Sequence, residues 1–474
     1  MRLTALLSVF LGLILVAAAV GLSYRDTMTP GVMGAPCGPT YLTSISTYIT
    51  EHQTPSNCSA PNGLASDEQG RIWFVEENVS KLAMYDPAAD EFVERDLPIS
   101  HPISWGMAVS DDGDVWLTEA NSSSILRFRP SSGKFEVHPL RPNSFPFQML
   151  TGPDGDVWFS ELYGRRIGRI DPMSGNMSEY DIPWEGMGPS GLAFDAHGVL
   201  WIAMVSFSQD LQGVISSFDP VNLTFSSYRT PLVISNPTGI AVDGTGKVWV
   251  TDHGSSLLIR YDPVTGDFMR VATSQKAGTT STLPYWLVKG PDGQLWFNEH
   301  YANRIGRFDA LNMTMTEYSV PSYVPTYGGV ANVLSIAVDP AGNLWFTEWS
   351  IGRIGVVNSS LRPDISLSGM GNISLRTGEK LQFSFEFTSR GTYSGPLSYG
   401  VASSETSDGT PKWLTIYPMF TLNSLNSSAS SGTIYLELKL EDDLGGDFYA
   451  LTVTVAEKGI SVSAVAPLHV ERGP

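Results

Sequence analysis

Cysteine and positive charge are scarce in this 474-residue sequence. There are two cysteines, which excludes a disulfide-rich scaffold and a cysteine-based zinc module. Lysine and arginine total 29 against 48 aspartates and glutamates, a formal net charge of −19, so we expect no nucleic acid as a partner. No Ser/His/Asp triad and no phosphate-binding loop can be recognised in the sequence. Charge and short motifs therefore do not identify the function, and the interpretation depends on the repeat pattern.

Long apolar runs are also missing, except at the N-terminus. Residues 3–22 follow Arg2 and read LTALLSVFLGLILVAAAVGL, which is typical of an export signal or a retained membrane anchor. We therefore expect residues 1–24 to be a signal peptide or an N-terminal anchor, and residues 25–42 to be a linker. The rest of the chain is predicted to be secreted or held on the outer face of the cell membrane, which it contacts through this segment only.

Two features agree with export. Cys37 and Cys58 are predicted to form a disulfide, because a lone pair of cysteines in an oxidising compartment closes a short loop. Asn-x-Ser/Thr glycosylation sequons are frequent and mark exposed loops. They begin at Asn57, Asn78, Asn121, Asn176, Asn222, Asn312, Asn358, Asn372 and Asn426.

A tryptophan-centred line recurs seven times and organises the chain. It reads IWFVE, VWLTE, VWFSE, LWIAM, VWVTD, LWFNE and LWFTE, around Trp73, Trp116, Trp158, Trp201, Trp249, Trp296 and Trp345. The copies are 42 to 49 residues apart, and each is flanked by further strand-like lines and Asp-Gly turns. Such a period is typical of a β-propeller, so we predict an all-β fold with a seven-bladed propeller over residues 43–360.

The ends of the repeat region indicate how the ring closes. Most repeats finish with a fourth line such as MSEYDIP, which ends at Pro183, but the seventh repeat stops before such a line. A line of this kind, TSISTYITEHQTP, stands instead at the start of the region, over residues 43–55. We therefore expect an N-terminal strand over residues 44–50 to complete blade seven, which would leave the ring without an open edge.

The repeat is absent after residue 360. Residues 361–474 contain alternating apolar and polar segments between turns rich in Gly, Ser and Asp, which is typical of an immunoglobulin-like β-sandwich. We expect this part to be a spacer or an adhesive module.

Hairpin geometry predicts where a site would lie. The start of the first strand of each blade and the end of the second strand return to the same face, so two rings of residues should surround one channel mouth. The first ring comprises Asn62, Trp105, Phe147, Ser190, Thr238, Tyr285 and Leu334, and the second comprises Glu76, Glu119, Glu161, Met204, Asp252, Glu299 and Glu348.

Carboxylates dominate the second ring. Mg²⁺ and Ca²⁺ prefer oxygen ligands, so Glu119, Glu161, Asp252, Glu299 and Glu348 are the candidate metal ligands. The alternative is structural: the repeated acid accepts hydrogen bonds from backbone amides or pairs with the arginine of the IGR line. Those arginines are Arg169, Arg307 and Arg353.

Aromatic and imidazole side chains accompany these acids. Trp105, Phe147, Tyr285 and Trp286 are candidates for a surface that stacks on a ligand ring or a sugar, or they plug the channel. The residues that follow the acids in two adjacent blades, His253 and His300, are either catalytic or ordinary loop residues.

Residues 44–358 resemble the virginiamycin B lyase (streptogramin lyase) family. The resemblance is carried by GPDGDVWFSELYGRRIGRI at residues 152–170 and LWFNEHYANRIGRF at residues 295–308. It implies a seven-bladed propeller and a magnesium-assisted elimination that opens a cyclic depsipeptide, using a general base with histidines and glutamates on the channel face. The family's two histidine places hold Tyr285 and Leu334 here, and its acid place in the last blade holds Trp349.

Two functions of different classes follow from these patterns. The first is recognition of a small molecule, a glycan or a surface protein at an acidic-aromatic channel mouth. The second is a divalent-metal-dependent lyase or lactone hydrolase that uses Glu299, His300 and Glu348. A structural cell-surface glycoprotein is a third interpretation, and the sequence leaves open whether the protein is an enzyme.

Overall fold

The computed structural model describes residues 40–42, 46–208, 212–229, 234–273, 282–325, 330–367, 371–376, 380–390, 398–403, 414–425, 429–440, 449–457 and 459–471. Across these ranges no helix is both long and apolar enough to cross a membrane. The apolar run at residues 3–22 lies outside the described residues, as do Cys37 and Asn426.

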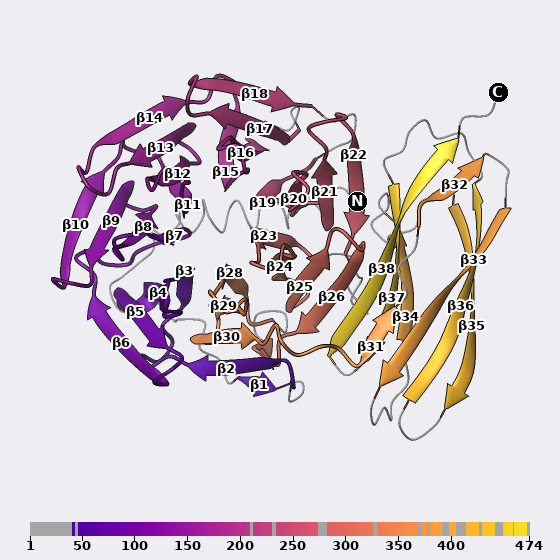
Figure 1. Ribbon diagram of the computed structural model, residues 1–474. Helices are drawn as coiled ribbons and strands as arrows, with labels where there is room; N and C mark the ends of the chain where they lie inside the picture. The colour runs from indigo at the N-terminus through magenta and orange to yellow at the C-terminus, as the bar shows by residue number, and fades with distance from the viewer. Residues whose placement is uncertain are drawn as a thin grey trace, which may run out of the picture.

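Seven units of four antiparallel strands form a ring around a central channel (Figure 1). Blade 1 consists of β3 (Pro61–Ser66), β4 (Ile72–Glu76), β5 (Lys81–Asp86) and β6 (Glu91–Asp96). Blade 2 consists of β7 (Met107–Val109), β8 (Val115–Glu119), β9 (Ser124–Arg129) and β10 (Lys134–Pro139). Blade 3 consists of β11 (Pro146–Thr151), β12 (Val157–Glu161), β13 (Arg166–Ile170) and β14 (Met177–Asp181). Blade 4 consists of β15 (Met187–Phe194), β16 (Leu200–Ser206), β17 (Val214–Asp219) and β18 (Thr224–Tyr228). Blade 5 consists of β19 (Pro237–Val242), β20 (Val248–Asp252), β21 (Leu257–Tyr261) and β22 (Phe268–Ala272). Blade 6 consists of β23 (Pro284–Lys289), β24 (Leu295–Glu299), β25 (Arg304–Asp309) and β26 (Thr314–Ser319). Six blades are separate sheets, and blade 6 continues into a larger sheet. The predicted propeller is confirmed.

Blade 7 is closed by the N-terminal strand, as predicted. It consists of β28 (Val333–Val338), β29 (Leu344–Glu348), β30 (Arg353–Val357) and β2 (Ile49–Gln53), and β2 pairs antiparallel with β30. The observed strand overlaps the predicted span of 44–50 at residues 49 and 50 and ends three residues later. A short ladder between β1 (Tyr41–Leu42) and β27 (Ser322–Tyr323) lies beside this closure. The ring is thus joined by residues about three hundred positions apart in sequence.

In six blades the second strand is buried along its whole length, and in blade 4 the first five residues of β16 are buried, because neighbouring blades cover both faces of the sheet. In blades 3, 6 and 7 the third strand carries a glycine opposite the phenylalanine of the second strand. A Cβ atom on Gly168 would lie 2.0 Å from the ring of Phe159, and Gly306 and Gly355 stand in the same relation to Phe297 and Phe346. The IGR line is therefore a packing requirement of the blade.

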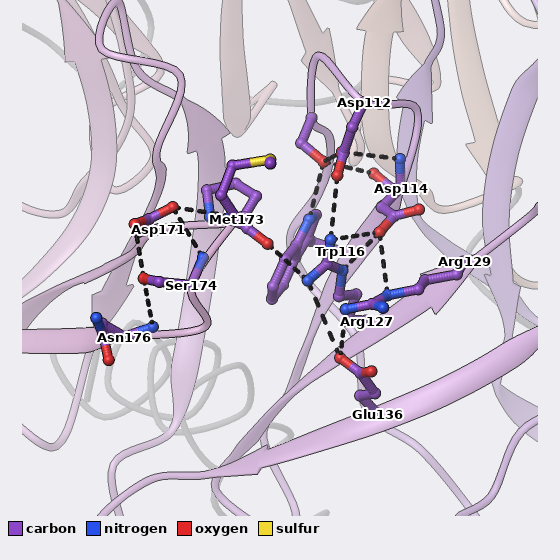
Figure 2. A network of polar contacts seen from close by, with 12 residues as sticks. Asp112, Asp114, Trp116, Arg127, Arg129, Glu136, Asp171, Met173, Ser174 and Asn176 are labelled. Atoms are coloured by element: carbon purple, nitrogen blue, oxygen red, sulfur yellow. Dashed lines mark hydrogen bonds and ion pairs between the residues drawn. The ribbon is translucent and has the colours of Figure 1, made fainter.

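The repeated tryptophans anchor the Asp-Gly turns, in keeping with a structural role. Arg127 lies over the ring of Trp116 at 4.8 Å from its centroid and pairs with Asp112 and Asp114, as Figure 2 shows. Its other guanidinium nitrogen donates to the carbonyl of Pro172 at 2.7 Å, which joins blade 2 to blade 3. Elsewhere the indole N–H donates to the turn aspartate, in the pairs Trp73–Asp67, Trp158–Asp154, Trp201–Asp195, Trp249–Asp243 and Trp345–Asp339.

The C-terminal region forms two sheets, one of which extends blade 6 (Figure 1). The first sheet has the order β31 (Ile365–Leu367), β33 (Lys380–Arg390), β36 (Ala429–Leu440) and β35 (Leu414–Leu425). In the second, β38 (Ile460–Glu471) pairs with β26, β37 (Tyr449–Glu457) and β32 (Ile373–Arg376), and β34 (Ser398–Ser403) pairs with β37. Phe385 and Phe387 of one sheet share a core with Leu451 and Val453 of the other, so the sheets pack as a sandwich. The immunoglobulin-like character of this sandwich stays a prediction.

Candidate functional site at the channel mouth

The first ring of residues, which we call the channel ring, lies on bulges of the innermost strands. The pairing register shifts between Pro146 and Met149, between Pro284 and Leu287, and at the same place in four other blades. A bulge re-aims a side chain out of the regular alternation. The ring members of these blades therefore need not follow the alternation of a regular strand.

Polar side chains of the second strands fix the channel ring from blade to blade. Thr251 accepts a hydrogen bond from the Gly239 amide at 2.8 Å and donates to the carbonyl of Tyr285 in the next blade. Asn298 accepts from the Trp286 amide at 2.7 Å and donates to the carbonyl of Val333. The aromatic residues of blade 6 are thus held by neighbours on both sides.

Four predicted ligand-binding aromatics come together across the channel. The ring centroids of Trp105 and Phe147 are 5.4 Å apart, those of Trp105 and Tyr285 6.0 Å, and those of Phe147 and Trp286 5.2 Å. Phe147 and Trp286 are buried, whereas Trp105 and Tyr285 are half-buried. These four residues, the aromatic cluster, therefore plug the channel, and two of them are only half-buried.

The aromatic cluster borders a cavity of about 390 Å³ inside the channel. The innermost strand of every blade lines this cavity, from Trp105 and Trp286 toward the Asp-Gly turns, where Ser66, Thr151 and Lys289 stand. The opposite side of the cluster faces the mouth at which the second strands end. That mouth is the candidate site.

His253 and His300 lie at this mouth as a contacting pair. Their Nε2 atoms are 3.5 Å apart, the rings are stacked with centroids 4.9 Å apart, and both rings contact Tyr285 edge-on. Burial lowers the pKa of His300 to about 4, and burial together with His300 lowers the pKa of His253 well below its usual value. Both imidazoles are therefore neutral at pH 7, and the sequence pattern correctly placed them side by side.

The second ring, of repeated acids, does not lie open at the mouth. All six carboxylates are at most 1% exposed. The second strand is separated from the channel by the first strand, so its last side chain points between blades, toward the third and fourth strands. The predicted acidic surface at the mouth is wrong for this reason.

Three of the acids accept hydrogen bonds within their own blade. Glu161 forms an ion pair with Arg166, Glu119 accepts from the amides of Ile103 and Asn121, and Asp252 accepts from two backbone amides. This supports the structural alternative for the repeated acid.

Two of the predicted arginine partners are wrong, because the antiparallel register places Arg169 opposite Trp158 and Arg307 opposite Trp296. The residue opposite Glu161 is Arg166, and Arg353 does lie opposite Glu348. Arg169 pairs with Asp154 and Asp156, Arg307 pairs with Asp292, and Arg353 pairs with Glu51 of the closing strand.

The other three acids are buried without a hydrogen-bond partner for either oxygen among the described residues. Burial is the main cause that raises the pKa of Glu76 and of Glu299 to about 8, and that raises the pKa of Glu348 well above its usual value. A nearby second carboxylate adds to each shift, from Glu94, Glu317 and Glu51 respectively, and the hydroxyls of Thr273 and Thr282 partly offset it at Glu299.

The five candidate metal ligands are not brought together by the fold. Glu119, Glu161, Asp252, Glu299 and Glu348 each lie inside a different blade, and within the described ranges no three His, Cys, Asp or Glu side chains are grouped closely enough to hold an ion. The raised pKa values of Glu299 and Glu348 keep two of them protonated at pH 7. The five residues do not fit a shared Mg²⁺ or Ca²⁺ site, and binding of either ion stays a prediction.

One residue at the mouth was missed by the sequence reasoning. The position after each repeated acid, which we call the collar, holds Glu77, Ala120, Leu162, Val205, His253, His300 and Trp349. Glu77 accepts a hydrogen bond from the indole N–H of Trp349 at 2.9 Å. Glu77 follows the repeated acid of its blade, as His253 and His300 do, so the same sequence position would also have identified Glu77.

Markers of export are partly visible in the structure. Cys58 is disulfide-bonded, and the sequon asparagines Asn57, Asn121, Asn176, Asn222, Asn312, Asn358 and Asn372 are exposed, whereas Asn78 is half-buried and donates to the Cys58 carbonyl. Exposure permits glycosylation at seven sequons, and modification itself stays a prediction.

These observations define a class: a seven-bladed propeller whose candidate site lies at one mouth of its channel. The chain belongs to the Virginiamycin B lyase family, whose model matches residues 90–364, more than half of the sequence.

Solved structures agree on the fold. A catalytically inactive histidine-to-alanine variant of virginiamycin B lyase from Staphylococcus aureus with quinupristin is 24% identical, with a TM-score of 0.57 over 65% of this chain and 98% of that chain. A streptogramin B lyase is 26% identical, with a TM-score of 0.56 over 66% of this chain and 97% of that chain. No curated protein sequence matches.

Proposed function

We propose that this propeller binds a ligand through the aromatic cluster at the mouth where His253 and His300 lie. The observation that supports the proposal most directly is the convergence of aromatic side chains from blades 2, 3 and 6, of which Trp105 and Tyr285 are half-buried residues. Aromatic rings offer apolar area at little cost in conformational entropy, which suits the recognition of another ring or a sugar face.

The protein is proposed to work outside the cell, secreted or anchored to the outer face of the membrane. The apolar run at residues 3–22, the disulfide at Cys58 and the exposed sequons support this location. The ligand would then be a small molecule, a glycan or part of a surface protein.

Binding is tested by calorimetric screening of aromatic small molecules, cyclic peptides and oligosaccharides. Trp105→Ala and Tyr285→Ala are expected to weaken binding of any hit by at least about tenfold, since each removes a stacking surface. Trp184→Ala is the matched control, because Trp184 is also half-buried but packs against Phe225 away from the cluster. An equal effect of all three substitutions would contradict the proposal.

The second candidate is an enzyme, a lyase or lactone hydrolase. It is favoured by the family membership and by the paired neutral imidazoles, either of which could accept a proton from a ligand held at the aromatic cluster. Glu299 and Glu348, predicted as catalytic, are fully buried inside their blades and do not reach the mouth.

Catalysis is tested by incubating the protein with cyclic depsipeptides and lactones, with and without Mg²⁺ and Ca²⁺. Ring opening seen by mass spectrometry and lost in His300→Ala would support the enzyme. Calorimetric titration of the same ions into wild-type protein and Glu299→Gln/Glu348→Gln protein reports whether these acids matter for metal binding. Binding without turnover in any condition would leave ligand recognition as the function.

A further inference from the structure

Glu77 is held over the channel mouth by the backbone. It begins the short 3-10 helix η1 (Glu77–Val79), and its amide donates to the carbonyl of Ala60. The equivalent bonds at the mouth run from His253 to Asn236 and from Trp349 to Asn332. Glu77 therefore occupies the same place in blade 1 as one of the histidines does in blade 5.

Three blades hold the Glu77 carboxylate. Asn62 of blade 1 donates its side-chain amide at 3.1 Å, Ser104 before blade 2 donates its backbone amide at 3.0 Å, and Trp349 of blade 7 donates its indole N–H at 2.9 Å. Ser104 directly precedes Trp105, so one donor to the carboxylate is joined by a single peptide bond to a member of the aromatic cluster.

All three of these donors are neutral. Some buried or half-buried acids of this chain have a cation of their own, as in the pairs Glu161–Arg166 and Glu51–Arg353, whereas Glu77, like Glu119 and Asp252, forms no ion pair with any described residue. The residue as a whole is half-buried. A carboxylate oriented by neutral donors and lacking a counter-charge is suited to receive a cation from outside.

We propose that Glu77 receives an ammonium or guanidinium group of a ligand whose ring packs on Trp105 and Tyr285, so that the mouth selects aromatic cations. The π faces of Trp105 and Tyr285, both of them half-buried residues, add attraction for the same positive charge. This inference rests on the proposed ligand site and names the chemical class of the ligand.

The charge state of Glu77 makes the selection pH-dependent. Burial raises its pKa to about 7, the three donors oppose this rise, and the carboxylate of Glu119 adds to it slightly. The acid is thus half ionised near pH 7, while an alkylammonium stays protonated up to about pH 10. Affinity for an aromatic cation is expected to rise between about pH 6 and pH 8, in step with the ionisation of Glu77.

The test compares three probes that share one ring and chain length: phenethylamine, 2-phenylethanol and 3-phenylpropanoate. At pH 8 the amine is expected to bind at least about fivefold tighter than the alcohol, by ligand-observed NMR or calorimetry, and the anion weakest. Glu77→Gln should abolish the preference for the amine. Glu185→Gln, which removes an exposed acid from the loop before blade 4, should leave it unchanged and thereby controls for the net charge of the protein.

The outcomes separate the two proposals. If the alcohol and the amine bind equally and Glu77→Gln changes nothing, the inference falls while the aromatic site stands. If no probe binds, both fall. Should Glu77→Gln fail to fold, the pH series on the wild-type protein decides: a preference for the amine that does not change from pH 6 to pH 8 would overturn the inference.

Discussion

At the scale of the residue, one repeated glutamate serves different purposes in different blades. Glu161 is matched by Arg166, whereas Glu299 has no hydrogen-bond partner among the described residues and lies near Glu317. Since burial penalises the charged form, Glu299 keeps its proton at neutral pH, whereas Glu161 forms an ion pair with Arg166. Substitution of the acid at this repeat position is therefore expected to have opposite effects on stability in blade 3 and in blade 6.

Glu299→Gln is expected to stabilise the protein in mildly alkaline solution. The folded-state pKa of Glu299 is about 8, above the ordinary value of 4.5, so only the unfolded chain loses this proton between those pH values. Its contribution to the free energy of unfolding is complete below pH 4.5, falls as the pH rises and levels off above about pH 8. Glutamine cannot ionise, so the variant should exceed the wild-type Tm by about 2–5 °C at pH 8 and match it at pH 5.

Glu161→Gln is the matched control at the same position of blade 3. It removes the charge that faces Arg166, so its Tm should fall at both pH values. A Glu299→Gln variant that loses as much stability at pH 8 as at pH 5 would show that the carboxylate is ionised in the folded protein.

At the scale of the element, the closing strand is fastened by side chains as well as by its ladder. Glu51 of β2 pairs with Arg353 of β30 at 3.0 Å and accepts hydrogen bonds from the amide and the hydroxyl of Ser322. Arg353 also donates to the Ser322 hydroxyl at 2.7 Å. Arg353 thus lies between two acids, Glu51 and Glu348. The third strands of blades 3 and 6 have the same arrangement, with Arg166 between Glu161 and Glu179 and Arg304 between Glu299 and Glu317.

Glu51→Ala is expected to loosen the ring. The substitution leaves Arg353 and the Ser322 amide without their acceptor, which costs about 2–3 kcal/mol for hydrogen bonds to a charged group and should lower Tm by several degrees. Thr50→Ala on the exposed side of the same strand should be nearly neutral. Hydrogen exchange of β30 amides measures the closure directly, and unchanged exchange in Glu51→Ala would contradict this account.

At the scale of the whole molecule, the C-terminal sandwich and the propeller share a sheet. β38 pairs with β26, the outer strand of blade 6, from Ile460 to Ala464, and Thr452 donates to the carbonyl of Ala272 in blade 5. This pairing covers the outer edge of blade 6, whereas the outer strands of the other blades end their sheets in the part of the chain that the structure describes. Unpaired edges favour association.

A chain that ends at residue 360 is expected to melt earlier and to associate. Its β26 edge would be exposed, and the apolar residues that it shares with the sandwich would lose their cover. Calorimetry and size-exclusion chromatography check this beside the full-length protein at equal concentration. A shortened chain that stays monomeric, with the Tm of the propeller transition unchanged, would show that the two parts are independent.

The sequence by itself determined the architecture. The count of the Trp-centred line gave seven blades, and the missing fourth line of the last repeat indicated the closing strand, because both signals are local and recur with a fixed period. It also brought His253 next to His300, since equal positions in adjacent repeats are neighbours in a ring.

Only the tertiary structure decided which side chains face the channel and which partners the acids have. The repeated acids share their position in sequence, yet the innermost strand separates them from the channel, and the antiparallel register gives Glu161 to Arg166 instead of Arg169. Trp105 and Tyr285 meet across blades 2 and 6, and Glu77 meets Trp349 across the closure. Such contacts depend on the closed ring, which brings together residues that no local pattern relates.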